Sequence, residues 1–122
     1  MRIAAALLAG ALVLAGCGAS GEAADETDGG PKATGTQVDI VIKDGKATPQ
    51  GKRVEVTAGT PVTLRITSDA DEEIHVHSEP EHEFEVGPGH VLDETFTIDT
   101  PGQVAVEAHH LGVTIVQLVV EP

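Results

Sequence analysis

The chain has 122 residues and a formal net charge of −13, from 20 Asp and Glu against 7 Lys and Arg. This length allows one small domain, and the acidic excess excludes a nucleic-acid binder, because a polyanion would be repelled. A single Cys excludes a disulfide framework and a zinc site built from cysteines. The unusual chemistry is concentrated in one region, because all six His lie between residues 75 and 110.

The N-terminus has the pattern of an export signal. Arg2 precedes an uncharged apolar run over residues 3–16, which is shorter than the roughly 20 residues that a membrane-spanning helix needs. The run ends in Leu14-Ala15-Gly16-Cys17, which resembles the bacterial lipobox, where a peptidase cuts before a Cys that becomes lipid-modified. We therefore predict a signal peptide over residues 1–16, lipidation of Cys17, and a membrane-anchored protein outside the cytoplasm, on the periplasmic or outer-surface side.

Two further segments differ in composition. Residues 17–36 are rich in Gly, Ala, Thr and acids and lack large apolar residues, so we predict a flexible acidic tether. Residues 37–122 instead alternate between apolar and polar residues, the period of a β-strand. The predicted strands, the last of them nearly all apolar, are 38–43, 53–57, 62–67, 73–77, 83–86, 95–99, 103–108 and 113–120. Turn signals such as Asp44-Gly45 separate them, so we predict an all-β domain, a Greek-key β-sandwich of seven to eight strands.

Three motifs in this domain resemble those of cupredoxin-like proteins. They are the hairpin sequence VTAGTPVTL at 56–64, the segment Asp71-Glu72-Glu73-Ile74-His75, and Thr100-Pro101-Gly102 before an alternating strand. Together they cover residues 37–121, and the chain resembles the EfeO-type cupredoxin-like family of small bacterial envelope proteins. The resemblance implies a cupredoxin-like sandwich in which the strands carrying His75 and His109 lie close together.

The sequence departs from that pattern at the ligands of a blue copper centre. Such a centre needs a Cys thiolate, two His and usually a weak axial Met. The position where the Cys would fall lies near Ala108, and Val113 stands where the axial Met would fall. Because Cys17 is the only Cys and Met1 the only Met, we expect neither a blue copper centre nor a thiolate-bridged binuclear copper site in this domain.

The histidines suggest a different metal site. His75 and His77 are two residues apart on one predicted strand and so point to the same side, and Glu107 and His109 repeat that spacing on another. If the two strands are neighbours, as the resemblance implies, these four side chains form one cluster. Three imidazoles and a carboxylate suit Cu(II), or Zn(II) as the alternative.

The remaining histidines are assigned to lesser roles. His110 is the alternative ligand to His109, and His82 is expected in a mobile acidic loop that could close over the site. His90 follows Gly87-Pro88-Gly89 and is expected in a turn. Glutamates at every second position from Glu79 to Glu85 are most simply a solvated strand face that could also attract cations.

The sequence favours binding over catalysis. It has no nucleophile elbow with a Ser–His–Asp order, no phosphate-binding Gly loop and no nucleophilic thiol in the domain. We therefore expect no enzyme, but a lipoprotein that buffers a divalent metal or delivers it to an unknown partner protein at the cell envelope. The alternative is a metal-free, degenerate cupredoxin that serves as an interaction module. A small metal-dependent redox enzyme is the weakest of the three readings.

Overall fold

The computed structural model describes residues 34–122. The predicted signal peptide, Cys17 and most of the predicted tether lie outside the described residues. The first strand begins at Thr36, one residue before the predicted start of the domain. Within residues 34–122 no helix is long and apolar enough to cross a membrane.

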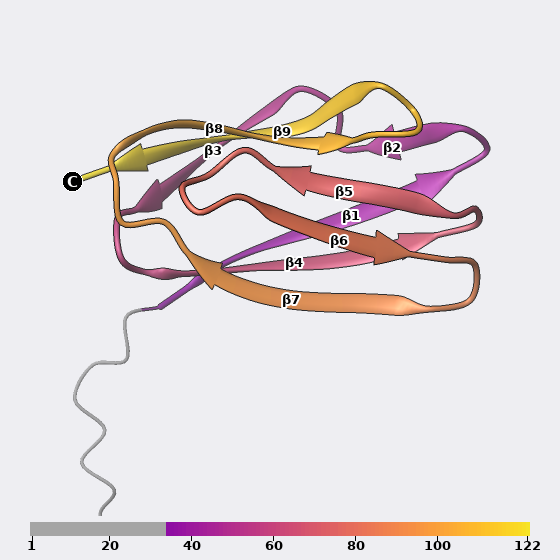
Figure 1. The fold of residues 1–122 in the computed structure, drawn as a ribbon, viewed down its shortest axis with the longest axis horizontal. Coiled ribbons are helices and arrows are strands. Elements are labelled where there is room, and N and C mark those ends of the chain that lie inside the picture. The colour runs from indigo at the N-terminus through magenta and orange to yellow at the C-terminus, as the bar shows by residue number, and fades with distance from the viewer. Residues whose placement is uncertain (1–33) are drawn as a thin grey trace, which may run out of the picture. The chain divides into compact units, whose positions relative to one another are not determined.

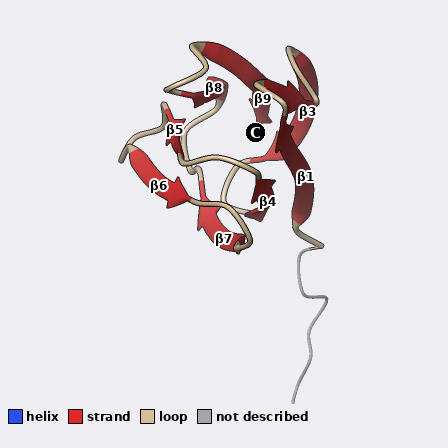
Figure 2. Ribbon diagram, turned by 90° about the vertical axis from the view of Figure 1, so that its right-hand side faces the viewer, coloured by secondary structure: helices blue, strands red, loops and turns tan. Residues whose placement is uncertain are grey.

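The described residues form an all-β sandwich, as predicted (Figure 1). One sheet has four strands in the order β2-β1-β4-β7, and the other has five in the order β3-β9-β8-β5-β6. The view along the strands shows the two layers enclosing a common interior (Figure 2). The strands are β1 (Thr36–Lys43), β2 (Lys46–Thr48), β3 (Lys52–Thr57), β4 (Pro61–Ser68), β5 (Glu72–Val76), β6 (His82–Val86), β7 (Val91–Thr97), β8 (Gly102–Ala108) and β9 (Val113–Glu121).

The alternating apolar residues make the core between the sheets. Leu64, Ile66, Ile74, Val76 and Val106 are fully buried, and each belongs to a strand predicted from the alternation. Burying one such side chain contributes roughly 1.5–3 kcal/mol. The residues between these buried positions on β5 and β8 therefore face outward. They include His75 on β5 and Glu107 on β8.

The prediction missed β2 and the first residues of β7. β2 follows the turn Asp44-Gly45, whose residues have φ values of 51° and 70°, as in the hairpin turns that suit twisted strands. It has only three residues and one buried side chain, Ala47, too few to show a period. β7 begins at Val91, four residues before the predicted start. The alternation missed this start because, at this sheet edge, Val91 is exposed and Leu92 is only half-buried.

A β-bulge in β9 lies next to Glu107. Val106 is level with Val116, whereas Glu107 is level with Thr114, so β9 has one extra residue, Ile115, at this point. The bulge explains why Ile115 and Val116 are both buried although they are adjacent in the sequence. Bulges redirect neighbouring side chains, and this one brings Thr114 beside Glu107.

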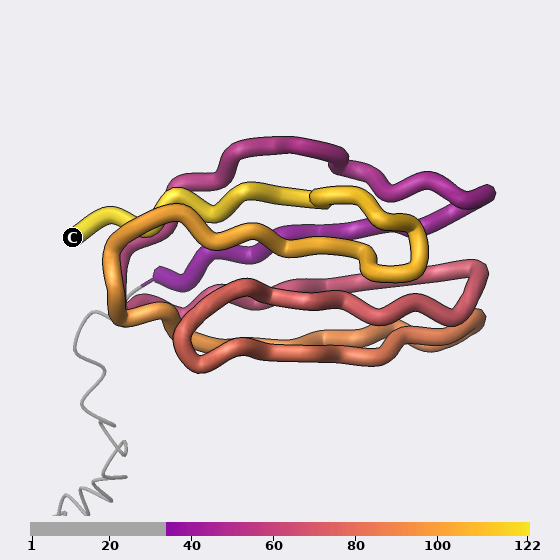
Figure 3. Tube along the Cα trace, turned by 45° about the horizontal axis from the view of Figure 1, so that its top comes forward, coloured from indigo at the N-terminus to yellow at the C-terminus, as the bar shows by residue number. Residues whose placement is uncertain are grey.

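The register of β5 sets the arrangement of its outer face. β5 pairs antiparallel with β6 on one side and with β8 on the other, so His75 is level with Glu83 and with Glu107. The β5–β6 connection lies at one end of the sandwich, and the turns after β1, β4, β6 and β8 gather at the other (Figure 3). The two ends therefore carry different sets of His and Glu side chains.

Candidate metal centre

Two imidazoles lie side by side at the end of β5. His75 belongs to the strand, and His77 follows its last residue, on the side opposite the buried Ile74 and Val76. Their ring centroids are 4.4 Å apart. The side chain of His75 is 17% exposed and that of His77 is 40% exposed, so the pair can be reached from solvent mainly through His77.

Glu81, in the connection between β5 and β6, completes a three-residue group with these rings. Its Oε1 lies 2.8 Å from His75 Nε2 and 3.3 Å from His77 Nδ1. One ligand atom of each of the three residues lies within 4.8 Å of the others. Two imidazole nitrogens and a carboxylate oxygen therefore converge on one small volume, an arrangement that divalent transition metals use.

Glu107 contacts the same pair from β8. Its Oε2 lies 2.8 Å from His77 Nε2 in a hydrogen bond, and its Oε1 accepts a hydrogen bond of 3.3 Å from the Thr114 hydroxyl. The pKa of Glu107 is lowered below its ordinary value, chiefly by the hydrogen bond with His77 and against the opposing effect of burial. Glu107 is thus an anion on the outer side of the imidazole pair.

The Nε2 atom of His75 is the least satisfied polar atom of the group. It is buried, and although Glu81 Oε1 is 2.8 Å away and Glu83 Oε1 is 3.5 Å away, neither is aligned for a hydrogen bond. The 2.8 Å between His75 Nε2 and Glu81 Oε1 is short enough for an ion pair. The two groups are nevertheless not aligned for a hydrogen bond, so the ring nitrogen has no hydrogen-bond partner among the described residues. A bound proton or a cation between these atoms would supply what the protein does not.

The surroundings of the group are acidic. Every Lys and Arg of the chain lies at or before Arg65, so β5, β6, β8 and β9 carry acids and histidines but no basic residue with a permanent charge. Glu73 is level with Glu85 on the neighbouring strand, next to the rung of His75 and Glu83. This acidic part of the sheet raises the local concentration of cations and repels anions.

His109, which we predicted as a ligand, is placed apart from this group. β8 ends at Ala108, and the backbone N–H of His109 donates to the Glu73 carbonyl at 2.8 Å. Because the strands are antiparallel, a residue two positions beyond Glu107 moves toward Glu73 and away from His77. The exposed His109 ring packs edge-on against that of His110, at 6.2 Å between centroids.

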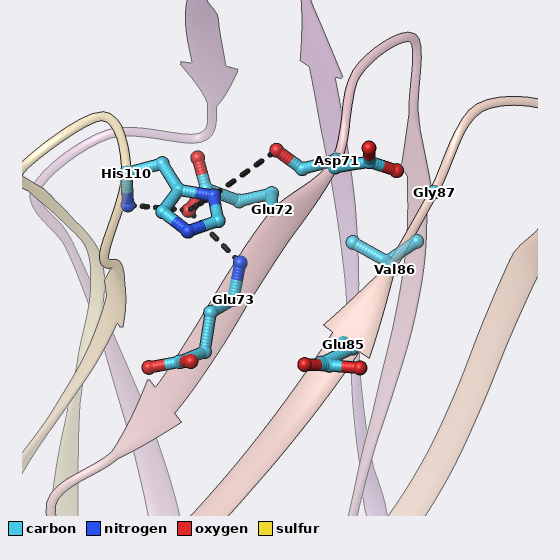
Figure 4. A pocket seen from close by; sticks show the side chains of 7 residues that line it. All are labelled: Asp71, Glu72, Glu73, Glu85, Val86, Gly87 and His110. Atoms are coloured by element: carbon cyan, nitrogen blue, oxygen red, sulfur yellow. Dashed lines mark hydrogen bonds and ion pairs between the residues drawn. The ribbon is translucent and has the colours of Figure 1, made fainter.

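His110 lies in the β8–β9 turn, at the end of the sandwich opposite the β5–β6 connection (Figure 1), and it lines a different hollow (Figure 4). Its ring Nδ1 is 3.1 Å from the Asp71 carbonyl, and Glu72, 3% exposed, accepts backbone hydrogen bonds from Glu73, His110 and Leu111. The hollow has a volume of about 400 Å³, and none of the three residues of the candidate metal site lines it. The buried Glu72 carboxylate accepts these bonds from the backbone of β5 and of the β8–β9 turn, and so holds the turn against β5.

The expectation that His82 lies in a mobile loop was wrong. His82 is the first residue of β6 and is level with the inward-facing Val76, so it takes the inner side of the sheet. Its ring lies 5.0 Å from that of Phe96 and 6.0 Å from that of Phe84. Alternation along β6 thus turns it away from the face that carries Glu83. His90 lies in the β6–β7 connection, as expected, and is exposed.

Sequence reasoning missed Glu81 as a member of the group. We assigned it to a solvated strand face, but it precedes β6 and turns back toward β5. The available signal was its position four residues after His77, within a short turn that joins two antiparallel strands. A ligand pair on one strand together with an acid in the following turn is a pattern that could have found it.

Comparison with known proteins identifies the fold. No family model and no curated protein matches the chain. Among solved structures, auracyanin A, a "blue" copper protein from Chloroflexus aurantiacus, is 13% identical with a TM-score of 0.54, over 71% of this chain and 99% of that one. A multi-copper oxidase from Pseudomonas thermotolerans is 19% identical with a TM-score of 0.53, over 73% of this chain and 30% of that one.

The similarity at these identities shows the fold alone. A chain of a heme-copper terminal oxidase is 18% identical with a TM-score of 0.51, and the match spans 70% of this chain and 65% of that one. The chain thus spans less than two thirds of both oxidase chains. The predicted cupredoxin-like fold is confirmed, whereas membership in the EfeO-type group stays a prediction.

Proposed function

We propose that this protein binds one divalent metal ion, Cu(II) in preference and Zn(II) as the second candidate, through His75, His77 and Glu81. The observation that carries the proposal is the convergence of two ring nitrogens and one carboxylate oxygen within 4.8 Å, with no aligned hydrogen bond at His75 Nε2. The ion is the protein's cargo, held for buffering or for delivery.

The donor set favours Cu(II) among the common ions. Imidazole and carboxylate are nitrogen and oxygen donors of intermediate hardness, and Cu(II) leads the Irving–Williams order for such sites. The domain supplies no sulfur donor, because the only Cys is Cys17 and the only Met is Met1. The acidic face around the group supports the capture of a cation and disfavours anionic ligands.

The location and partner of the protein belong to the same proposal. The lipobox-like sequence before Cys17 supports a lipid anchor and a place outside the cytoplasm. At the envelope, a carrier would release its ion to another protein. The sequence has no nucleophile elbow and no thiol in residues 37–122, which supports a carrier rather than an enzyme.

A titration with Cu(II) near neutral pH tests the proposal. We would use the full chain in detergent with Cys17→Ser, so that no thiol competes for copper, and follow binding by calorimetry and EPR. We expect one equivalent bound with a Kd below about 1 μM, nitrogen hyperfine structure, and loss of this binding in the variant with His75→Ala and His77→Ala.

A matched control is available in the same chain. His90→Ala removes an exposed imidazole outside the group and should leave the Kd unchanged. Copper binding that is absent, or that survives the double substitution at His75 and His77, would reject the proposal.

The metal-free interaction module remains the second candidate, and one observation favours it. His75 Nε2 and His77 Nε2 already lie 2.8 Å from Glu81 and Glu107, contacts that protonated rings would satisfy without any metal. This candidate predicts that the double substitution at His75 and His77 leaves the biological function intact.

A further inference from the structure

We infer that Glu107 is a positioning residue that holds the His77 ring with its Nε2–H toward β8 and its Nδ1 lone pair toward His75 and Glu81. This inference rests on the proposed function and reassigns Glu107, which we predicted as a metal ligand. It makes Glu81 the carboxylate of the ligand set and gives Glu107 the task of orienting one of the two imidazoles.

The two nitrogens of His77 have unequal contacts. A neutral imidazole donates one hydrogen bond and accepts one. Nε2 makes an aligned hydrogen bond of 2.8 Å with Glu107, whereas Nδ1 lies 3.3 Å from Glu81 Oε1 in a charge contact only. The proton of the neutral ring therefore belongs on Nε2, and Nδ1 is left with a lone pair that faces another acceptor.

Both oxygens of Glu107 are occupied. Oε2 accepts from His77, and Oε1 accepts from the Thr114 hydroxyl at 3.3 Å. Thr114 is level with Glu107 because of the bulge at Ile115. Thr114 on β9 therefore holds the Glu107 carboxylate, which reaches from β8 to His77. Glu81 has no such anchor among the contacts of the described residues, and its side chain is 52% exposed.

The division of roles follows from these contacts. The group of atoms close enough to share one ion contains His75, His77 and Glu81, but not Glu107. A histidine that binds a metal through one nitrogen commonly donates its other N–H to a carboxylate, and loss of that carboxylate typically weakens metal affinity by about 10- to 100-fold. Glu107 stands in that position relative to His77.

Three variants separate a positioning role from ligation. We would compare Glu107→Ala, Glu107→Gln and Glu81→Gln in the full chain with Cys17→Ser. The Gln side chain at 107 keeps an oxygen that accepts from Nε2–H but removes the charge, so it preserves the orientation if the fold tolerates the change. Far-UV circular dichroism checks that each variant is folded.

The first readout is the tautomer of His77 in the metal-free protein, from long-range nitrogen–proton NMR at about pH 8, where imidazoles are largely neutral. We expect the Nε2–H form in the parent protein and in Glu107→Gln, and a mixture of both forms in Glu107→Ala. An Nδ1–H form in the parent protein, or an unchanged tautomer in Glu107→Ala, would overturn the inference.

The second readout is Cu(II) binding, followed as Kd and EPR spectrum. We expect Glu107→Ala to raise the Kd by about 10- to 100-fold and Glu107→Gln by less than about tenfold, both with the parent's EPR parameters. Glu81→Gln should change those parameters, because a ligand is lost. A spectrum altered by Glu107→Gln would instead identify Glu107 as a ligand and reject the positioning role.

The two proposals fail in different ways. A parent protein that binds no Cu(II), but whose His77 tautomer depends on Glu107, would reject the metal-carrier function and leave the orienting contact established. A parent protein that binds Cu(II) with a tautomer and a Kd indifferent to Glu107→Ala would keep the function and reject the positioning role.

Discussion

The outer faces of the two sheets carry opposite kinds of polar pairs. On the four-stranded sheet, Arg65 lies 3.6 Å from Asp93, and the Thr63 and Thr95 hydroxyls are 2.8 Å apart, so level residues on β4 and β7 complement one another. On the five-stranded sheet, Glu73 is level with Glu85, a like-charge pair of the kind that destabilises a sheet. The first face stabilises the fold by ordinary cross-strand pairing, whereas the second bears an electrostatic cost at the residues beside the proposed metal site.

The largest effect concerns how the strand with the imidazoles is held. Glu72→Ala would leave three backbone N–H groups, of Glu73, His110 and Leu111, without their buried acceptor. We expect the free energy of unfolding to fall by about 3 kcal/mol or more, since each buried unpaired donor costs about 1–3 kcal/mol. Urea denaturation measures it.

Glu73→Ala is the matched control, because Glu73 is the next residue and faces outward. We expect it to change the free energy of unfolding by less than about 0.5 kcal/mol. Equal effects of the two substitutions would show that Glu72 does not anchor the β8–β9 turn to β5, and that the two faces differ less than the contacts indicate.

The second effect is the pH dependence of Cu(II) binding at His75 and His77, on the face that bears the like-charge pair. A metal binds only the unprotonated ring nitrogen, so protons compete with it where imidazoles titrate. We expect the Kd for Cu(II) to rise as the pH falls from about 7.5 to about 5.5, because protons compete with the metal for the imidazole nitrogens. Competition with a chelator of known affinity measures the Kd. Affinity that is retained at the lower pH would exclude imidazole ligation.

The third effect reverses the like-charge pair. Glu85→Lys places a cation level with Glu73, as Arg65 is placed level with Asp93 on the other sheet. We expect the free energy of unfolding to rise by about 0.5–1 kcal/mol at low salt, and less at high salt. Thermal melts at two ionic strengths test this. A melting temperature that fell would show that the pairs on the two faces are not comparable.

The smallest effect is the fall in the free energy of unfolding at acidic pH that is due to Glu107. The pKa of Glu107 is lower in the folded protein than its ordinary value of 4.5, chiefly because of the His77 hydrogen bond. Its contribution is therefore fully present above pH 4.5 and is lost as the pH falls through the folded-state pKa. We expect the dependence of unfolding free energy on pH in that window to be flatter in Glu107→Gln. Superimposable curves would show that Glu107 does not contribute.

Alternation predicted the fold well because the core is made of every second residue on most strands. It failed at β2, which has one buried side chain, and at the start of β7, where an edge strand buries little. The same alternation placed His75 and His77 on one face. It did not place Glu81 or His109, because their positions depend on the path of a turn and on the register between strands, which no local period encodes.

Strand β6 ends the five-stranded sheet, so its outer backbone edge has no strand partner within that sheet. Its exposed side chains are Glu83 and Glu85, and two copies of the protein that approached along this edge would bring like charges together. The negative charge beside the imidazoles thus also disfavours edge-to-edge pairing of two copies at β6. Replacing these glutamates by neutral apolar residues would expose a template for intermolecular sheet growth, even where it left the proposed metal ligands in place.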